Sequence, residues 1–383
     1  MSVLSLKRLD RINWDFPSAG TELGSVHSIH WFPGNYIPQI PAALIQVLSR
    51  TGEVVFDPFG GSGTTAIEAL KLGRFAVVSD RISACVQITE AKLSLLGNPL
   101  DRDVCNKIFS SLTFEHLCQS TQIGVNGEGR AEDLECWYSS ETLGQLRYIW
   151  KIIELQSSQV QKVLFALFSN VLFACASTNG SRTHTGKLRR HHWGWVADNV
   201  RPKELIFHNA IELFCKNLRA VMDTNRGPIS TTAKVIQQDA RNMELEDESV
   251  DLVVTSPPYA GVIDYTHANR LLYLWMGWPM GEERADEIGA RYRRNRKNAV
   301  EEYLSDMRLC RDQIHRVLKK GSYCAIVVGE SKKFPNTASL LIEDFSQSMP
   351  IVWGPKSRYL SRRRVSDRVA GDPVEFVCVF QKL

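Results

Sequence analysis

The chain has 383 residues, of which 44% are hydrophobic and 23% are charged, a balance typical of a soluble globular protein. The formal net charge of +4 is too small to identify a partner by itself. The longest apolar stretch, residues 163–176, is interrupted by Ser169 and Asn170 and is short for a bilayer, so we expect a buried helix and no membrane association.

The nine cysteines are scattered and form no C-x-x-C pair, which disfavours a zinc knuckle and a dithiol redox site. The first fifteen residues mix charged with apolar side chains and do not resemble a secretory signal. We therefore expect a cytoplasmic protein with reduced thiols.

The first marked feature is an aromatic turn that runs from His27 through His30, Trp31 and Phe32 to Pro33-Gly34. Two histidines three residues apart suggest a metal, but no further ligands are spaced nearby. We therefore expect a structural or ligand-contacting role for these histidines and no metal. A short amphipathic helix is predicted over residues 41–49.

A buried strand at residues 53–57 leads into a glycine-rich turn, Asp57-Pro-Phe-Gly-Gly-Ser-Gly-Thr64, which opens a helix. This order brings backbone amides to a ligand at the helix N-terminus. Thr64 stands where a P-loop has lysine, and the glycines do not follow the G-x-G-x-x-G dinucleotide pattern. A second acid, Asp80, follows the strand at residues 74–79, where nucleoside-binding βαβ units place the carboxylate that binds ribose hydroxyls.

Residues 84–230 are predicted to be mainly helical, with apolar periodicity at 143–155 and 161–176. Basic side chains concentrate in three predicted loops, at 181–195, 284–297 and 356–368. A solvated basic surface is the alternative for each loop, but three such loops together favour an acidic polymer as the partner. The candidate contacts to it are Arg182, Lys187, Arg189, Arg190, Arg293, Arg294, Arg362, Arg363 and Arg364.

The strand pattern returns at residues 234–239, a segment that ends in Asp239. Further strands are predicted at 250–254, 323–329 and 374–380. Helices are predicted at 264–275 and 300–318. The strand at 250–254 meets Thr255-Ser-Pro-Pro-Tyr259. Two prolines stop the hydrogen-bond ladder and leave carbonyls free. Alone, this stretch would be a surface turn, but a hydroxyl, a free carbonyl and a ring also suit a planar heterocycle that carries an amino group.

Taken together, these motifs resemble the amino-methylating DNA methyltransferases that use S-adenosylmethionine. The resemblance rests on Phe59-x-Gly61-x-Gly63 after Asp57-Pro58 and on Thr255-Ser-Pro-Pro-Tyr259, with His30-x-x-Pro33-Gly34, Asp80, Asp239 and the Glu375 strand as further landmarks. It covers residues 27–99 and 234–383 and implies a prokaryotic protein. The implied α/β fold is Rossmann-like, of the class I methyltransferase type, with a mostly parallel seven-stranded sheet and a largely helical insertion.

We expect residues 1–95 and 231–383 to form the two parts of the methyltransferase domain. Residues 96–230 would be the insertion. In the family, target recognition usually follows the Asp239-like strand or lies at a terminus, and this chain departs from that order. We hypothesise that residues 96–230 share target recognition with the loops at 284–297 and 356–368.

The resemblance also implies residue roles. A cofactor site would comprise His30, Pro33, Gly34, Asp57, Pro58, Phe59, Gly60, Gly61, Ser62, Gly63, Thr64, Asp80 and Asp239. The catalytic residues would be Ser256, Pro257, Pro258 and Tyr259. Ser256 and the carbonyl of Pro257 would hold the target amine, and Tyr259 would stack on the flipped base. No covalent intermediate is expected, because cytosine C5 methylation requires a Pro-Cys pair that this chain lacks.

Serine at the start of the Ser-Pro-Pro-Tyr tetrad favours cytosine N4 in duplex DNA within this family. Adenine N6 methylation of DNA, guanine N2 methylation of RNA and a nucleic-acid-binding protein with a vestigial methylation site remain as alternatives. A cognate restriction endonuclease is a candidate partner. The recognised site and the oligomeric state do not follow from the sequence.

Overall fold

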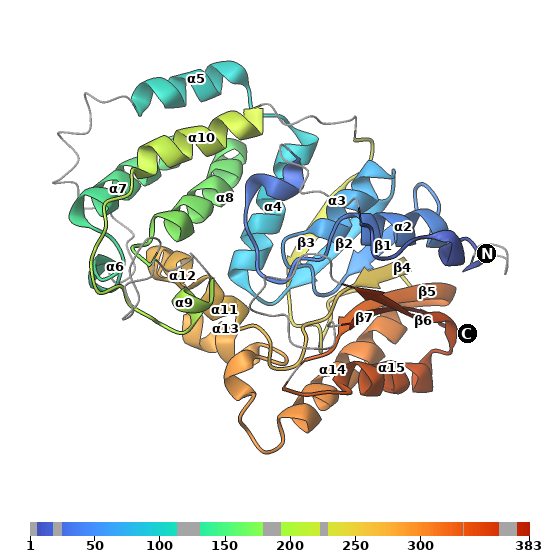
Figure 1. Ribbon diagram of the computed structural model, residues 1–383. Helices are drawn as coiled ribbons and strands as arrows, with labels where there is room; N and C mark the ends of the chain where they lie inside the picture. Colours follow the sequence, from blue (N-terminus) through green and yellow to red (C-terminus); the bar gives the residue numbers. More distant parts are fainter. Residues whose placement is uncertain are drawn as a thin grey trace.

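The centre of the molecule is one seven-stranded sheet of order β3-β2-β1-β4-β5-β7-β6 (Figure 1). A computed structural model describes residues 6–17, 25–112, 131–178, 193–222, 229–331, 333–359 and 374–383. The strands are β1 Val54–Asp57, β2 Phe75–Asp80, β3 Ala233–Gln237, β4 Val250–Thr255, β5 Leu318–Gly329, β6 Ile351–Tyr359 and β7 Val374–Gln381. The neighbours from β3 to β5 pair parallel, and β7 is antiparallel to both β5 and β6.

This topology confirms the predicted Rossmann-like class I methyltransferase fold. The chain leaves β1 toward β2 and β3 on one side and returns to β4 on the other. In open sheets of this kind, ligands bind outside the carboxyl ends of the strands where the strand order reverses. That point lies between β1 and β4, and the two motifs singled out in the sequence follow these two strands.

Helices cover both faces of the sheet (Figure 1). The strand β5 explains why, since its side chains alternate between two buried clusters. Ala325 and Val327 belong to one cluster, whereas Cys324 and Ile326 belong to the other. The covering helices are α2 Gln39–Leu48, α3 Thr64–Lys71, α4 Ser83–Gly97, α14 Ala299–Val317 and α15 Thr337–Ser348.

Between β2 and β3 the chain forms the expected helical segment, with α5 Arg102–Ser111, α6 Ala131–Glu135, α7 Ser140–Glu154, α8 Ser158–Cys175, α9 Trp193–Ala197 and α10 Ala210–Met222. In the described residues, α8 is the one helix whose length and composition would also suit a membrane span. It packs against α4, and Leu164, Phe168 and Leu172 lie in the same buried cluster as residues of α4, as expected for the core helix that the sequence predicted.

Several elements differ from the sequence predictions. Trp193 and Trp195, at the end of the loop predicted at 181–195, lie in α9. The single helix predicted over 264–275 is two helices, α11 Tyr265–Ala268 and α12 Arg270–Met276, divided at Asn269, whose side chain donates to the carbonyl of Tyr265. The predicted loop at 284–297 contains the end of α13, Met280–Asp286, and a short 3-10 helix, η4 Arg291–Arg293. Lys356, placed in a basic loop, lies in β6.

Candidate active site

Asp57 fixes the position of the glycine-rich turn that follows β1. Its buried carboxylate accepts hydrogen bonds from the hydroxyls of Thr65 (2.6 Å) and Thr255 (2.5 Å) and from the backbone N–H of Phe59 (3.0 Å). Burial raises the pKa of Asp57 to about 6, although these three hydrogen bonds favour the ionised form. Asp57 thus joins the start of α3 to the end of β4.

Gly60 fixes the same turn to β2 from the side. Its N–H donates to the carbonyl of Ser79 at 2.9 Å. A Cβ at this position would lie 2.1 Å from Cγ2 of Val78 and 3.2 Å from the carbonyl oxygen of Ser79. Only glycine therefore lets the turn lie this close to β2. Gly63, with φ of 81°, then starts α3 from the left-handed region that glycine favours.

We expect Gly60→Ala to lower the free energy of unfolding by about 1–3 kcal/mol, because the methyl group overpacks the contact with Val78. Chemical denaturation measures this change. Gly97→Ala is the matched control, since a Cβ there meets nothing within 4 Å. The cost should be partly relieved in the double mutant Gly60→Ala/Val78→Ala. Strictly additive costs in that double mutant would contradict the steric explanation.

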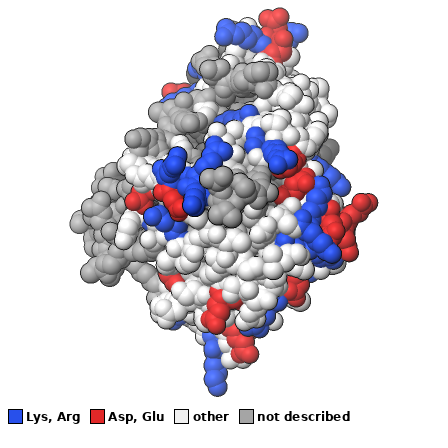
Figure 2. Space-filling model, turned by 90° about the vertical axis from the view of Figure 1, so that its right-hand side faces the viewer, with Lys and Arg blue, Asp and Glu red and all other residues white. Residues whose placement is uncertain are grey.

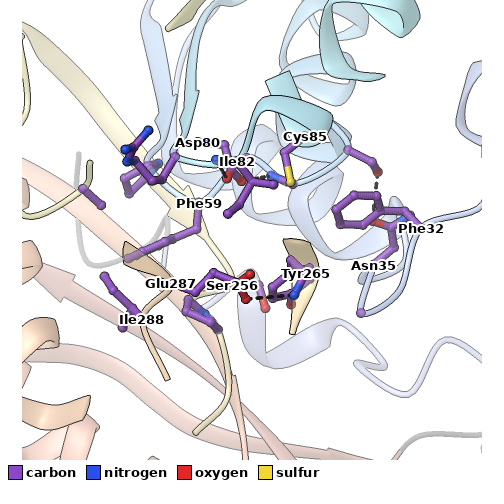
Figure 3. A pocket seen from close by; sticks show the side chains of 18 of the residues that line it. Phe32, Asn35, Phe59, Asp80, Ile82, Cys85, Ser256, Tyr265, Glu287 and Ile288 are labelled. Carbon is purple, nitrogen blue, oxygen red and sulfur yellow. Dashed lines mark hydrogen bonds between the residues drawn. The ribbon is translucent and has the colours of Figure 1, made fainter. Parts of the chain in front are cut away.

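A cavity, which we call the first cavity, opens above this turn at the carboxyl ends of β1, β2 and β4 (Figure 3). The residues singled out in the sequence that line it are Gly34, Pro58, Phe59, Gly60, Gly61, Ser62, Thr64, Asp80, Asp239, Ser256 and Pro258. The other lining residues, for which no role in the site was predicted, are Phe32, Asn35, Tyr36, Arg81, Ile82, Cys85, Ala240, Tyr265, Asp286, Glu287 and Ile288. The first cavity thus combines apolar walls with several carboxylates.

Asp80 stands at the end of β2 with its carboxylate toward the first cavity (Figure 3). Its two oxygens accept from the backbone N–H groups of Gly61 (2.9 Å) and Ile82 (3.0 Å), which fix its orientation. Burial raises the pKa of Asp80 to about 6. Each carboxylate oxygen has a second lone pair, so Asp80 can still accept hydrogen bonds from hydroxyl groups of a ligand.

Two further carboxylates differ in how well they are paired. Arg241 contacts Asp239 at 2.6 Å and Asp306 at 2.8 Å. Although burial raises the pKa of Asp239, the hydrogen bonds from Arg241 outweigh burial and lower it overall. Glu287 accepts from the backbone N–H groups of Tyr265 (2.9 Å) and Thr266 (2.8 Å), and its burial raises its pKa to about 7.

A second cavity adjoins the first and is lined by Gly34, Asn35, Tyr36, Ser256, Pro257, Tyr259, Val262, Ile263, Tyr265 and Glu375. Five of these residues, Ser256 among them, also line the first cavity. Ser256 therefore stands where the two cavities meet. The carbonyl of Pro258 accepts from the hydroxyl of Tyr303 at 3.0 Å, whereas that of Pro257 accepts no hydrogen bond from the described residues.

Tyr259 is fixed on one side of the second cavity. Its ring packs on Gly329, where an added Cβ would lie 2.5 Å from Cε2 of the ring. Its hydroxyl donates to Glu375 at 3.0 Å, and Glu375 is ion-paired with the buried guanidinium of Arg358. The ring therefore has a defined position.

Some predicted residues lie outside both cavities. His30 is buried, contacts Ser169 at 3.0 Å and stacks on Trp31, and burial lowers its pKa to about 3. Pro33, Asp57 and Gly63 do not line either cavity, although all three lie within or beside the turns that do. The roles expected for them remain predictions.

Of the predicted polymer contacts, the structure describes only Arg293 and Arg294. Both are half-buried, and Arg293 donates to the hydroxyl of Tyr292 and to the carbonyl of Ala285. Arg182, Lys187, Arg189, Arg190, Arg362, Arg363 and Arg364 lie outside the described residues. On the face that Figure 2 shows, basic and acidic side chains lie next to one another across the described surface.

The chemistry of the first cavity fits S-adenosylmethionine. Among its lining residues, Arg81 is ion-paired with Asp286, and Asp80 and Glu287 have no cationic partner in the described structure. Such walls suit a ligand with positive charge. Phe59, Ile82 and Ile288 form apolar surfaces that suit a flat ring (Figure 3).

The sequence pattern of a family described as DNA methylase matches residues 17–91 and 250–382, more than half of the chain. The chain is 19% identical to the Type II methyltransferase M.MjaII of Methanocaldococcus jannaschii, over 88% of this chain and 80% of that protein. It is 24% identical to the Type II methyltransferase M.MvaI of Kocuria varians, over 67% of this chain and 59% of that protein.

Solved structures show a weaker likeness. A SAM-dependent methyltransferase of Methanosarcina mazei has a TM-score of 0.33 and 10% identity, with 89% of this chain and 97% of that chain covered. An rRNA methyltransferase, aviRa, of Streptomyces viridochromogenes has a TM-score of 0.31 and 11% identity, with 96% of this chain and 94% of that chain covered. Similarity at this level carries no functional information.

Proposed function

The chain belongs to the family of DNA methylases that act on N6 of adenine or N4 of cytosine, and from the serine at position 256 we propose that its target is N4 of cytosine in duplex DNA. Its cofactor is S-adenosylmethionine. The main support for the proposed mechanism is the position of Ser256, where the first and second cavities meet. One cavity there is lined by the glycine-rich turn and Asp80, and the other by Pro257 and Tyr259.

In the proposed arrangement the first cavity holds the cofactor. The turn from Pro58 to Thr64, with Gly34, would contact its amino-acid part, and Asp80 would accept hydrogen bonds from its ribose hydroxyls. Asp239 was expected to bind the adenine amine. Because Arg241 already occupies much of that carboxylate, any such bond would use a remaining lone pair. When bound, the cofactor supplies an electrophilic methyl group on a sulfonium.

The second cavity would receive the target base after it leaves the DNA stack, at a cost of a few kcal/mol. Tyr259 would stack on its face. The hydroxyl of Ser256 and the carbonyl of Pro257 would accept hydrogen bonds from the exocyclic amine. Acceptors placed there draw the amine protons out of the ring plane, which returns the nitrogen lone pair from the ring and makes it a nucleophile. Orientation and charge placement would supply most of the rate enhancement.

Serine at position 256 supports cytosine N4 because a hydroxyl both donates and accepts, as the cytosine edge requires. Adenine N6 is the second candidate, since both activities occur in the family and the same hydroxyl can accept from an adenine amine. We also propose that the chain serves in a Type II restriction-modification pair in the prokaryotic cytoplasm, by analogy with the named relatives. Residues 96–230 remain our candidate for part of the target recognition.

The test is incubation of the protein with methyl-labelled cofactor and genomic DNA from a strain without amino-methylated bases, followed by digestion to nucleosides. We expect the label in N4-methylcytosine. Label in N6-methyladenine would overturn the choice of base, and label found only when RNA replaces DNA would overturn the choice of polymer. Intact cofactor binding without any transfer would favour the vestigial alternative.

A further inference from the structure

A third cavity, which we call the arginine cavity, lies among α9, α11, α12, α13 and the segment that follows α13, and these helices lie together in Figure 1. Its polar lining includes Arg270, Arg284, Arg291, Arg294 and His267, with the ring of Tyr292. The basic loop predicted at 284–297 contains Arg284, Arg291 and Arg294, whereas no contact to a polymer was predicted for Arg270 or His267. The lining therefore carries an excess of positive charge in one recess of the surface.

The acids of the arginine cavity do not balance these cations. Asp198 forms a two-point ion pair with Arg291 at 2.7 and 3.1 Å. The buried Asp264 accepts from the backbone N–H of Tyr292 at 3.0 Å. In the described part of the chain, Arg270, Arg284 and Arg294 have no acidic partner. Two acids thus face four arginines, and one acid is already paired.

The guanidinium groups are held in place without an anion. Arg270 donates to the carbonyl of Ala197 (3.2 Å) and to Nδ1 of His267 (3.1 Å), and the guanidinium carbon of Arg284 lies 4.0 Å from the ring centre of Tyr292. The Nε atoms of Arg270 and Arg284 are buried and have no hydrogen-bond partner in the described structure. Unpaired buried donors are costly, which favours a ligand rich in acceptors.

The pKa of His267 also reflects the excess of positive charge in the arginine cavity. Burial, together with the charges of Arg270 and Arg284, lowers the pKa of His267 to about 4, despite a smaller opposing effect of Asp198. Arg284 and Arg201 also lower the pKa of Arg270, after the larger effect of burial. Positive charge is therefore crowded at this point, and an anion would relieve the crowding.

The arginine cavity is next to the second cavity. One short segment separates them, because Ile263 and Tyr265 line the second cavity whereas Asp264 and His267 line the arginine cavity. The backbone N–H of Arg291 donates to the carbonyl of Ile263 at 3.2 Å, which ties the two walls together. Arg294 lies against Gly261 in the same segment.

From this arrangement we infer that the arginine cavity binds a backbone phosphate of the DNA strand that carries the target base, an inference that rests on the proposed function. A base that enters the second cavity remains joined to the phosphates on either side of its sugar. The planar guanidinium group of arginine can donate two parallel hydrogen bonds to phosphate oxygens. Such a contact would position the extruded nucleotide so that its base faces Ser256.

Salt titration of DNA binding tests this inference. Fluorescence anisotropy with a labelled mixed-sequence duplex gives the slope of log affinity against log salt concentration for the full chain. For Arg284→Gln we expect the magnitude of that slope to fall by about 1, with weaker binding at low salt, because one phosphate contact releases about one counterion. Arg308→Gln is the matched control, since Arg308 lies on α14 outside the arginine cavity, and it should leave the slope unchanged.

Two additional measurements keep the outcomes separate. Thermal unfolding and cofactor binding show whether Arg284→Gln is folded, and Arg294→Gln replaces it if it is not.

A shift in thermal stability with inorganic phosphate alone, without any change in the DNA slope, would identify a free-anion site and overturn the inference. If the wild type methylates DNA but both variants keep its slope, the inference fails and the proposed function stands. If no methyl is transferred but the slope still falls, the proposed function fails and the phosphate contact stands.

Discussion

Replacing Tyr259 with alanine is expected to lower the rate of methyl transfer by at least about 100-fold while leaving the cofactor affinity within about twofold of the wild type. Stacking of a base on an aromatic ring contributes about 1–3 kcal/mol, and the loss of a correctly oriented base adds to this. Tyr259 lines the second cavity and not the first, so its removal should not reach the cofactor. Single-turnover kinetics with labelled cofactor, beside calorimetric binding of the cofactor, measures both effects.

Tyr259→Phe separates the ring from the hydroxyl. It keeps the packing on Gly329 and removes the hydrogen bond to Glu375. If stacking is the role of Tyr259, the phenylalanine variant should lose no more than about tenfold in rate, because the ring stays packed on Gly329 and the lost hydrogen bond to Glu375 acts only on ring position. A phenylalanine variant as slow as the alanine variant would assign the effect to the link with Glu375, and full activity of the alanine variant would remove stacking from the mechanism.

The two motifs could be predicted from sequence because their positions follow from strand ends. The glycine-rich turn follows β1 and Ser256 follows β4, and these strands are neighbours in the sheet. The carboxyl ends of parallel neighbours meet at one edge, so residues about 200 positions apart converge without any knowledge of side-chain packing. The helices α7, α8 and α14 could be predicted for a similar reason, since each has a periodic apolar face.

The parts that were missed depend on contacts that no local pattern encodes. Glu287 enters the first cavity because it accepts from the N–H groups at the start of α11, more than 20 residues earlier in the chain. Asn35 reaches the same cavity because it accepts from the hydroxyl of Ser62 at 2.8 Å. The strand β6 was missed because Pro355 and its charged residues oppose a strand pattern, while its pairing with β7 is decided by tertiary structure.

Asp80→Ala is expected to weaken cofactor binding by roughly 10- to 100-fold, because hydrogen bonds to a charged acceptor contribute about 1.5–3 kcal/mol. Asp80 also orients the turn through the N–H groups of Gly61 and Ile82, so part of the loss comes from the turn itself. Asp312→Asn, an exposed change on α14, is the control and should leave the affinity unchanged. Isothermal titration calorimetry at fixed pH measures the difference.

The pH dependence tests the charge on Asp80 directly. Burial raises its pKa to about 6, above the ordinary value near 4, so folding favours its protonated form. Its contribution to stability without cofactor is therefore complete below about pH 4 and is lost as the pH rises through about 6. The ribose hydroxyls would donate to the ionised carboxylate, so cofactor affinity should rise over the same pH interval. Asp57 and Glu287, whose pKa values are raised to about 6 and about 7, shift stability in the same direction.

Asp80→Asn isolates this effect from the others. The amide is neutral at every pH, so the part of the pH dependence that belongs to Asp80 should disappear, while that of Asp57 and Glu287 remains. We expect wild-type affinity to rise between pH 5 and pH 7 and the variant's affinity to change less over the same range. An unchanged pH profile in Asp80→Asn would mean that the ribose does not bind to an ionised Asp80, and the observed titration would then belong to Glu287, whose carboxylate lines the same cavity.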